Sequence, residues 1–319
     1  MEAIEQGEAA PATEGVYLLT VVSPRKDEGN SPTGIVGRRL ARQLLSQGRR
    51  VRVIAEPDQC GCWPEAVEVV EGSITRPLDC SRAFDGVEAV FLAGAHPSTV
   101  QDALLLARKA SARRIALLSS HGPEYEEANP PETWFWLAIE KTVEHSGIAW
   151  THIRPSAVMG AAVEGTYPAT GADWPDTVRA EGVVREAFSD RGHYPFIHEE
   201  DLAAVAAAAL TGDDYTGTVI EAVGPPLSTR SRIRSITAAL GRDIDAVTLT
   251  PDESRAVWRR LGWPEGAIEV TLYALEEYGA RYAELLQWTL DQRPSVQDIT
   301  GRPPRTYDDW LSENIDAFR

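Results

Sequence analysis

The feature that most constrains this chain is a strand–helix–strand unit close to its N-terminus. Residues 16–22, VYLLTVV, form a near-continuous apolar run, which is typical of a parallel strand covered on both faces. Gly34 and Gly37 open the next segment, TGIVGRRLARQLL, which has the period of an amphipathic helix. RVRVIAE follows as a second strand. A strand, a glycine-containing turn and a helix in this order predict a βαβ unit of a parallel sheet.

The same alternation continues through the first half of the chain. Further strand patterns at 87–94, 114–120 and 149–159 predict an α/β fold with a doubly wound, Rossmann-like parallel sheet. The second half is richer in helical patterns, which predicts a small, mainly helical C-terminal substrate region. We divide the chain into a disordered acidic tail at 1–14, a Rossmann-type nucleotide-binding domain at 15–155, and a substrate region at 156–319 that is interleaved with the sheet.

Composition limits the partners that this chain can have. Its net charge of −17 repels phosphate backbones, so we expect no nucleic-acid binding. No apolar run is long enough to span a bilayer, and the acidic start lacks the features of a signal peptide, so we expect a cytoplasmic protein. The three cysteines lack the spacing of a zinc site, and we expect no metal. A small-molecule substrate fits best, bound by a monomer or a homodimer.

Six stretches of the chain together carry a resemblance to a known family. They are TGIVGRRLARQLLSQGRRVRVI, GVEAVFLAG, RIALLSS, AIEKTVEHSGIAWTHIRPSAVM, FIHEEDLAAVAAAAL and GRPPRTYDDWLSENIDAFR. Their order and spacing resemble the NmrA-like group of atypical short-chain dehydrogenases/reductases, from about Val16 to the C-terminus. The resemblance implies a Rossmann domain that usually binds NADP or NAD. The family includes reductases, tailoring enzymes of natural-product pathways, and proteins that sense nucleotides without turnover.

The glycine loop departs from the family pattern. Its members usually read TGATGxxG, with a glycine directly after the strand, whereas Val21 stands there and SPRKDEGNSP precedes Gly34. Two interpretations remain open. The insertion bulges outward and Thr33, Gly34 and Gly37 still meet a phosphate, or it fills the groove and no cofactor binds. We expect a surface loop over the mouth of the groove, with a phosphate-bearing ligand bound more weakly than in relatives with a tight loop.

The residue after the second strand bears on the choice of nucleotide. Glu56 repels a 2′-phosphate but can accept hydrogen bonds from a free ribose diol, which favours NAD over NADP. Arg25 and Lys26, in the insertion, could supply a substitute phosphate contact. We therefore assign cofactor binding to Thr33, Gly34, Gly37, Glu56 and Arg25.

Proton transfer needs residues other than the usual ones. Typical short-chain dehydrogenases pair a tyrosine with a lysine four residues later, so that the cation lowers the pKa of the phenol. Trp136 and Glu140 have that spacing here, and neither can do that work. The chain therefore uses a different acid or base, or none.

Two histidines follow strand ends, where ligands of parallel sheets bind. His96 follows VFLAGA, and His121 follows IALLSS beside Ser119 and Ser120. Imidazole titrates near neutral pH, so we name His121, Ser120 and His96 as candidate catalytic residues, and expect His121 to contribute more than His96. Lys141 could orient a substrate oxygen.

Aromatic residues predict the substrate contacts. His193 and Phe196 lie near where family members shape their substrate pocket, and Trp136 and Trp174 belong to a set that would suit a flat aromatic ligand. Each tryptophan could equally be a core residue.

Three functions follow from these features. The leading one is an NmrA-like tailoring enzyme of secondary metabolism, such as antibiotic biosynthesis, acting on a small aromatic or polyketide-like intermediate by NAD(P)H-dependent reduction. The interrupted glycine loop and the missing Tyr/Lys pair motivate an alternative, a cofactor-free isomerase, cyclase or lyase. A non-catalytic nucleotide-sensing regulator is the third.

Overall fold

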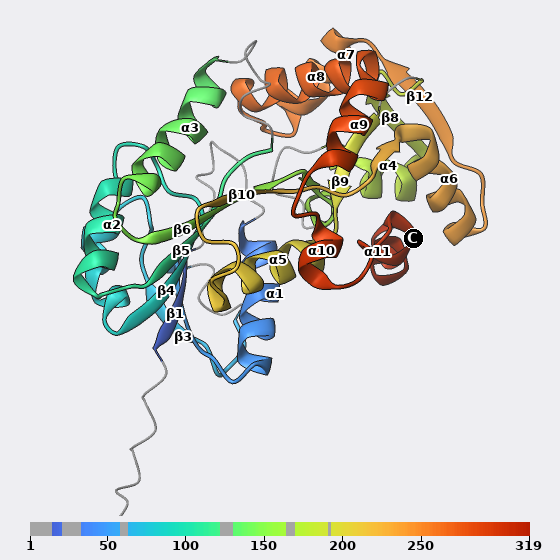
Figure 1. The fold of residues 1–319 in the computed structure, drawn as a ribbon. Coiled ribbons are helices and arrows are strands. Elements are labelled where there is room, and N and C mark those ends of the chain that lie inside the picture. The colour runs from blue at the N-terminus through green and yellow to red at the C-terminus, as the bar shows by residue number, and fades with distance from the viewer. Residues whose placement is uncertain (1–14, 21–32, 58–62, 122–129, 164–169, 191–192) are drawn as a thin grey trace, which may run out of the picture.

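A computed structural model describes residues 15–20, 33–57, 63–121, 130–163, 170–190 and 193–319 (Figure 1). The predicted tail at 1–14 and the segment that holds Val21, Arg25 and Lys26 lie outside the described residues. The predictions about the shape of the insertion therefore stay predictions.

Seven parallel strands form the main sheet, in the order β10-β6-β5-β4-β1-β2-β3. They are β1 (Val16–Thr20), β2 (Arg50–Ala55), β3 (Glu68–Glu71), β4 (Val87–Leu92), β5 (Arg114–Leu118), β6 (Ala149–Pro155) and β10 (Thr218–Ala222). The order runs outward in both directions from β1, which is the doubly wound arrangement predicted from the sequence. Its switch point, where such sheets open a ligand crevice, lies between β1 and β4.

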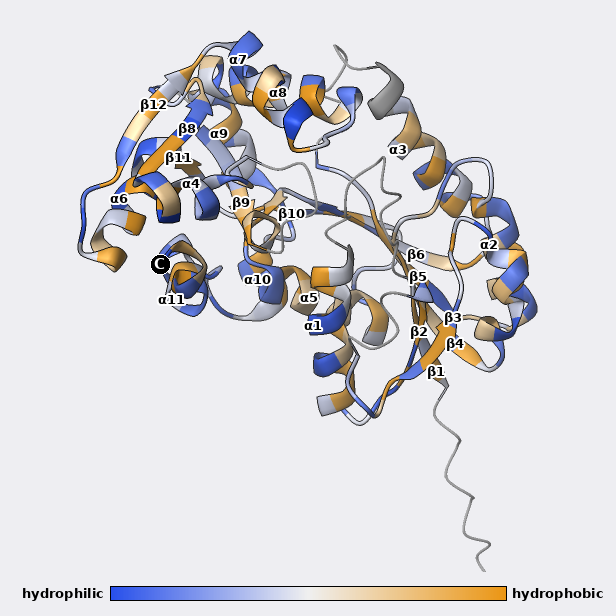
Figure 2. Ribbon diagram, turned by 180° about the vertical axis from the view of Figure 1, so that it is seen from behind, coloured by the Kyte–Doolittle hydropathy of each residue, from blue (hydrophilic) through white to orange (hydrophobic). Residues whose placement is uncertain are grey.

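Helices cover both faces of this sheet (Figure 1). On one face, α1 (Thr33–Ser46) and α5 (Glu199–Thr211) bury apolar side chains against β1, β2, β4 and β6. On the other, the 3-10 helix η2 (Pro77–Phe84), α2 (Val100–Lys109) and α3 (Pro130–Glu144) pack over a second cluster. Hydrophobic residues line the inner sides of these elements, as Figure 2 shows. Because both faces are buried, the strands read as continuous apolar runs.

Thr20, the last residue of β1, joins the two strands at the switch point. Its hydroxyl donates to the carbonyl oxygens of Phe91 and Ala93, at 3.2 and 2.8 Å, and the Ala93 N–H lies 2.8 Å from the same oxygen. This contact holds the carboxyl ends of β1 and β4 together where the crevice begins.

The C-terminal region lies beyond the carboxyl ends of the strands (Figure 1). Its helices are α4 (Trp174–Glu181), α6 (Thr229–Leu240), α7 (Pro251–Arg260), α8 (Glu265–Ala280), α9 (Tyr282–Asp291), α10 (Val296–Thr300) and α11 (Tyr307–Asn314), with 3-10 helices η4 (Met159–Ala162) and η5 (Ile315–Phe318). The helices α8 and α9 are separated by a break at Arg281.

Two small sheets accompany these helices. One has the order β11-β9-β7 and the other pairs β12 with β8. Their strands are β7 (Ala157–Val158), β8 (Val183–Ala187), β9 (His193–Ile197), β11 (Pro226–Ser228) and β12 (Asp245–Leu249). The strand pattern predicted at 149–159 includes β7, whereas β8, β9, β11 and β12 were not predicted. Since α5 and β10 return to the main sheet from beyond residue 155, the chain crosses between the two regions more than once. None of the helices in the described parts of the chain has the length and apolar character needed to cross a membrane.

A candidate active site at the carboxyl edge of the sheet

Neighbouring strands bring four charged or polar side chains together at one edge of the sheet. The register of the parallel pair β6–β10 sets Arg154 opposite Glu221. Ser119 and His121 follow β5, which pairs with the other side of β6. Glu140 comes from the helix α3. Ser119, His121, Glu140, Arg154 and Glu221 are all more than nine-tenths buried, so contacts among them are poorly screened by water.

Glu140 anchors one end of this network. Its Oε1 accepts hydrogen bonds from Ser119 Oγ at 2.6 Å and from Arg154 Nε at 2.9 Å, and its Oε2 accepts one from Arg154 Nη2 at 2.7 Å. Burial alone would raise the pKa of the Glu140 carboxyl, but the hydrogen bonds from Arg154 and Ser119 outweigh it and lower that pKa. The position with lysine-like spacing therefore holds an ionised structural carboxylate.

Glu221 links Arg154 to His121. Its Oε1 lies 3.2 Å from Arg154 Nη1, and its Oε2 lies 2.9 Å from His121 Nδ1. A carboxylate only accepts hydrogen bonds, so Nδ1–H of the imidazole is the donor.

The network places two buried carboxylates, Glu140 and Glu221, on one guanidinium. Arg154 pairs with both, so neither carboxylate is buried without a counter-charge.

An indole from the C-terminal region covers the imidazole. The ring of Trp288, in α9, is tilted by 56° over His121 with the ring centroids 4.9 Å apart. Trp288 is not among the residues that the sequence analysis singled out, and neither is Glu221. No local sequence signal marks either residue, since only the fold brings them to His121.

Three other predicted catalytic residues lie outside this network. Ser120 is half-buried, and its neighbour Ser119 makes the bond to Glu140. His96 is exposed, with Nδ1 2.7 Å from Ser98 Oγ and its ring edge-on to Phe135 at 5.5 Å.

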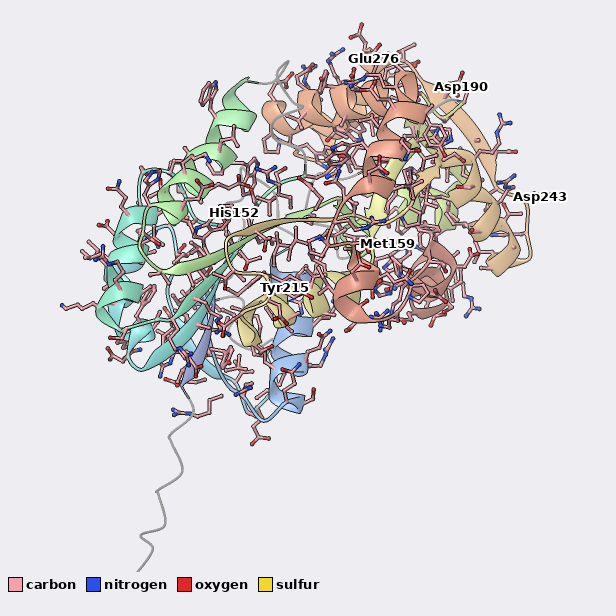
Figure 3. The ribbon with its side chains drawn as sticks, viewed as in Figure 1. His152, Met159, Asp190, Tyr215, Asp243 and Glu276 are labelled. Atoms are coloured by element: carbon pink, nitrogen blue, oxygen red, sulfur yellow. The ribbon has the colours of Figure 1, made fainter. Side chains whose placement is uncertain are left out.

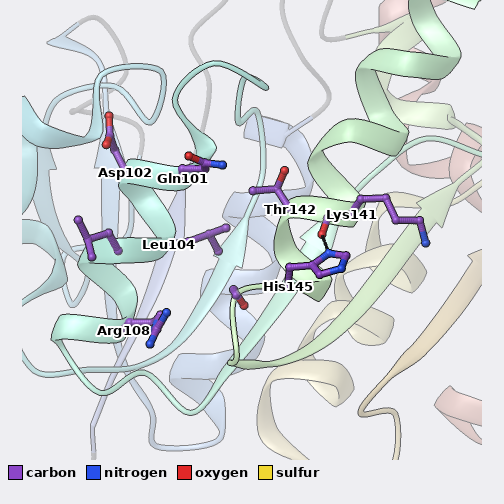
Figure 4. Close-up of a pocket in the computed structure, with 9 residues that line it drawn as sticks. Gln101, Asp102, Leu104, Arg108, Lys141, Thr142 and His145 are labelled. Carbon is purple, nitrogen blue, oxygen red and sulfur yellow. Dashed lines mark hydrogen bonds between the residues drawn. The ribbon is translucent and has the colours of Figure 1, made fainter.

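The structure places Lys141 apart from this network, and its role in orienting a substrate stays a prediction. Lys141 points away from the network because it follows Glu140 by one residue on α3. Its Nζ bonds Glu144 at 2.8 Å, and 64% of its side chain is exposed. With His145 it lines an outer groove of about 620 Å³ between α2 and α3 (Figure 4).

Two of the predicted substrate residues, Trp174 and Phe196, lie in a hydrophobic cluster around Arg232. Trp174 and Phe196 are 1% and 3% exposed, and the guanidinium of Arg232 lies between them, 4.1 and 4.5 Å from their ring centroids. Their described surroundings are those of a core, in which Arg232 also bonds Glu186 at 3.0 Å.

The other two predicted substrate residues, His193 and Trp136, are half-buried. His193 stacks on Tyr282 of α9, with ring centroids 3.9 Å apart. Trp136 is half-buried and contacts Phe135 at 5.2 Å.

The residues around the switch point have the chemistry that a dinucleotide needs. The helix α1 begins at Thr33, half-buried Gly34 and buried Gly37 lie in its first turns, and Glu56 follows β2. Free N–H groups at such a helix start favour a phosphate, and a carboxylate after the second strand suits a ribose. At the end of β6, the hydroxyl of Ser156 is buried and has no hydrogen-bond partner among the described residues. Such an atom fits a polar ligand group at this edge.

Comparisons with known proteins agree with this geometry. The model of a family described as NAD(P)H-binding matches residues 32–213, more than half of the chain. The (4-alkanoyl-5-oxo-2,5-dihydrofuran-3-yl)methyl phosphate reductase of Streptomyces griseus is 31% identical over 292 residues, which cover 90% of this chain and 96% of that protein. The NAD(P)H azoreductase of Xenophilus azovorans is 27% identical over 79% of this chain and 84% of that one.

Solved structures share the fold. The NADPH complex of an Escherichia coli quinone oxidoreductase has a TM-score of 0.71 at 18% identity, covering 94% of this chain and 99% of that one. The Citrobacter triphenylmethane reductase complexed with NADP(H) has a TM-score of 0.68 at 17% identity, with the same coverage. The chain thus belongs to the NAD(P)H-binding family of atypical, NmrA-like short-chain dehydrogenases/reductases, and it is an NAD(P)-dependent oxidoreductase of that type.

Proposed function

We propose that this enzyme reduces a conjugated double bond in a small aromatic or polyketide-like natural-product intermediate, with His121 as the proton donor. The observation that carries the proposal is the buried His121–Glu221 pair at the carboxyl edge, 2.9 Å from Nδ1 to Oε2. A reductase of this family needs a proton source, and the Tyr/Lys pair that normally supplies one is missing from this chain.

The nucleotide would bind at the start of α1 and beside the end of β2. Thr33, Gly34 and Gly37 would hold its phosphates at the start of α1, and Glu56 would face a ribose diol. When bound, NAD(P)H supplies a hydride to the electron-poor carbon of the substrate. Arg25 would add a phosphate contact from the insertion, as the sequence predicts.

His121 completes the reduction by delivering a proton. Hydride addition at the carbon β to a carbonyl leaves an electron pair that is shared by the α-carbon and the carbonyl oxygen, and a proton from Nε2 neutralises it. Glu221 keeps Nδ1–H engaged, so that Nε2 is the nitrogen that exchanges the proton. Arg154 fixes Glu221, and Glu140 with Ser119 fixes Arg154.

The relatives support this class of substrate. The Streptomyces griseus relative is named as a reductase of a dihydrofuran that bears an oxo and an alkanoyl group. A third relative, the agroclavine dehydrogenase of Claviceps fusiformis, is 34% identical over 65% of this chain and 66% of that protein. Neither name fixes the substrate of this chain, so the assignment to a natural-product intermediate is our proposal.

A labelled reduction tests the proposal. The probe is benzylideneacetone, a planar aryl enone, with NADH or NADPH that carries deuterium at the transferred position. We expect nucleotide oxidation and one deuterium at the carbon β to the carbonyl, with the α-hydrogen drawn from solvent. Nucleotide binding without oxidation would instead indicate a sensor, and conversion of the enone without nucleotide would indicate a cofactor-free enzyme. Either result would overturn the proposal.

A further inference from the structure

We infer that Trp288 of α9 determines the substrate specificity of this site, by giving a planar conjugated ligand a flat wall beside the proton donor. The inference rests on the proposed reduction, because it takes His121 as the reacting residue. It adds a residue and an element that the sequence analysis did not assign to the site.

The contact with His121 places Trp288 at the reacting group. The two ring centroids are 4.9 Å apart, so the indole covers one side of the imidazole. Neighbouring residues of α9, Leu285 and Thr289, are 5% and 8% exposed, whereas Trp288 is half-buried. The helix is therefore fixed by its buried side while the indole keeps part of its surface accessible.

A second aromatic contact ties the same helix to β9. Tyr282, the first residue of α9, stacks on His193 of β9 at 3.9 Å with an interplanar angle of 28°. The imidazoles of His121 and His193 thus each contact an aromatic ring of α9. Two such contacts from one helix hold α9 beside the end of β5 and beside β9.

The polar character of the sheet edge explains why Trp288 should favour planar substrates. The network at the sheet edge is polar, and its members hydrogen-bond to one another and to His121. They are Ser119, Glu140, Arg154 and Glu221. Apolar contact with a substrate must therefore come from other elements, and an indole offers a large, rigid surface. A flat conjugated substrate can stack on that surface, whereas a puckered ring of the same size loses part of the contact.

Two matched probes separate shape from reactivity. Benzylideneacetone and its cyclohexyl analogue carry the same enone, but only the first has a planar ring. In Trp288→Leu we expect kcat/KM for benzylideneacetone to fall about three- to tenfold more than kcat/KM for the cyclohexyl analogue, which is the size of a typical aromatic contact. Trp288→Phe should keep the preference, and the KM for the nucleotide should not change in either variant.

The control variant is Trp263→Leu. Trp263 stacks on Trp258 at 4.8 Å in a separate cluster of the C-terminal region, so its loss should leave the preference between the probes intact. Equal losses on both probes in Trp288→Leu, or no loss, would overturn the inference. If the wild-type protein reduces neither probe, the proposed reduction is what fails. The inference is then judged by calorimetric binding of the two probes, where an equal affinity for both in the wild-type protein overturns it.

Discussion

Among single residues, Arg154 has the largest part in shaping the candidate site. It donates to Glu140 at 2.7 and 2.9 Å and to Glu221 at 3.2 Å, and its side chain is 7% exposed. Removing it would leave two carboxylates buried without a counter-charge, which is strongly destabilising. Its first role is therefore to make the carboxylate of Glu221 available to His121.

Glu56 leads to a prediction about nucleotide choice. A carboxylate at the end of β2 repels the 2′-phosphate of NADP, so the wild-type protein should bind NADH about tenfold more tightly than NADPH. Glu56→Ala should narrow that difference by improving NADPH binding. Calorimetric titration of both proteins with both nucleotides checks this. Tighter NADPH binding by the wild-type protein would show that another group, such as Arg25, neutralises the phosphate.

His152 leads to a prediction about acid stability. Its side chain is fully buried under α3, beside the main sheet (Figure 3). The ring stacks on Trp150 with the centroids 4.3 Å apart, and its Nε2 lies 3.5 Å from Glu144 Oε1. Neither ring nitrogen has a hydrogen-bond partner among the described residues. Burial lowers the pKa of His152 below its ordinary value, so the folded protein keeps this ring neutral.

The sign of the pH effect follows from that shift. The unfolded chain takes up a proton on this histidine below about pH 6.5, whereas the folded chain does so only at lower pH. The free energy of unfolding should therefore fall as the pH drops below about 6.5, and His152→Leu should weaken that dependence. Urea unfolding at several pH values measures it, with His145→Leu, an exposed position directly after α3, as the control. An unchanged pH dependence in His152→Leu would contradict the account.

Among elements, the turn from β10 to β11 has the least room for change. A Cβ on Gly224 would lie 1.8 Å from the carbonyl oxygen of Phe196, so the two backbones are in direct contact. Gly224→Ala should lower the free energy of unfolding by about 2 kcal/mol or more, because a backbone must shift. Gly266→Ala in α8 is the matched control, since nothing lies within 4 Å of its added Cβ, and alanine favours a helix. Equal stability of the two variants in urea would refute this packing.

The elements also show how far sequence reasoning reaches. Continuous apolar runs predicted the strands of the main sheet, because parallel strands buried on both faces leave that pattern. The short strand β11 was missed, since three residues carry no readable period. Trp174 and Phe196 were predicted as substrate contacts because aromatic residues suit both pockets and cores, and only the packing around Arg232 shows their core surroundings.

For the molecule as a whole, the site depends on segments that are far apart in the chain. His121 was predicted because it follows a strand end, which is a local signal. Glu221 lies 100 residues further along, in the last strand of the sheet, and Trp288 comes from a C-terminal helix. Their positions depend on strand order and on how the C-terminal region covers the sheet edge, so no local pattern could have predicted them.

A double-mutant cycle in His121 and Glu221 tests the central claim most directly. The measurement is kcat for NAD(P)H-dependent reduction of benzylideneacetone by His121→Ala, Glu221→Gln and the double variant, each expressed per folded molecule. If Glu221 acts through His121, His121→Ala should lower kcat about a hundredfold, and the double variant should be no slower than His121→Ala alone. Losses that multiply in the double variant, or a near-native rate in His121→Ala, would contradict the account.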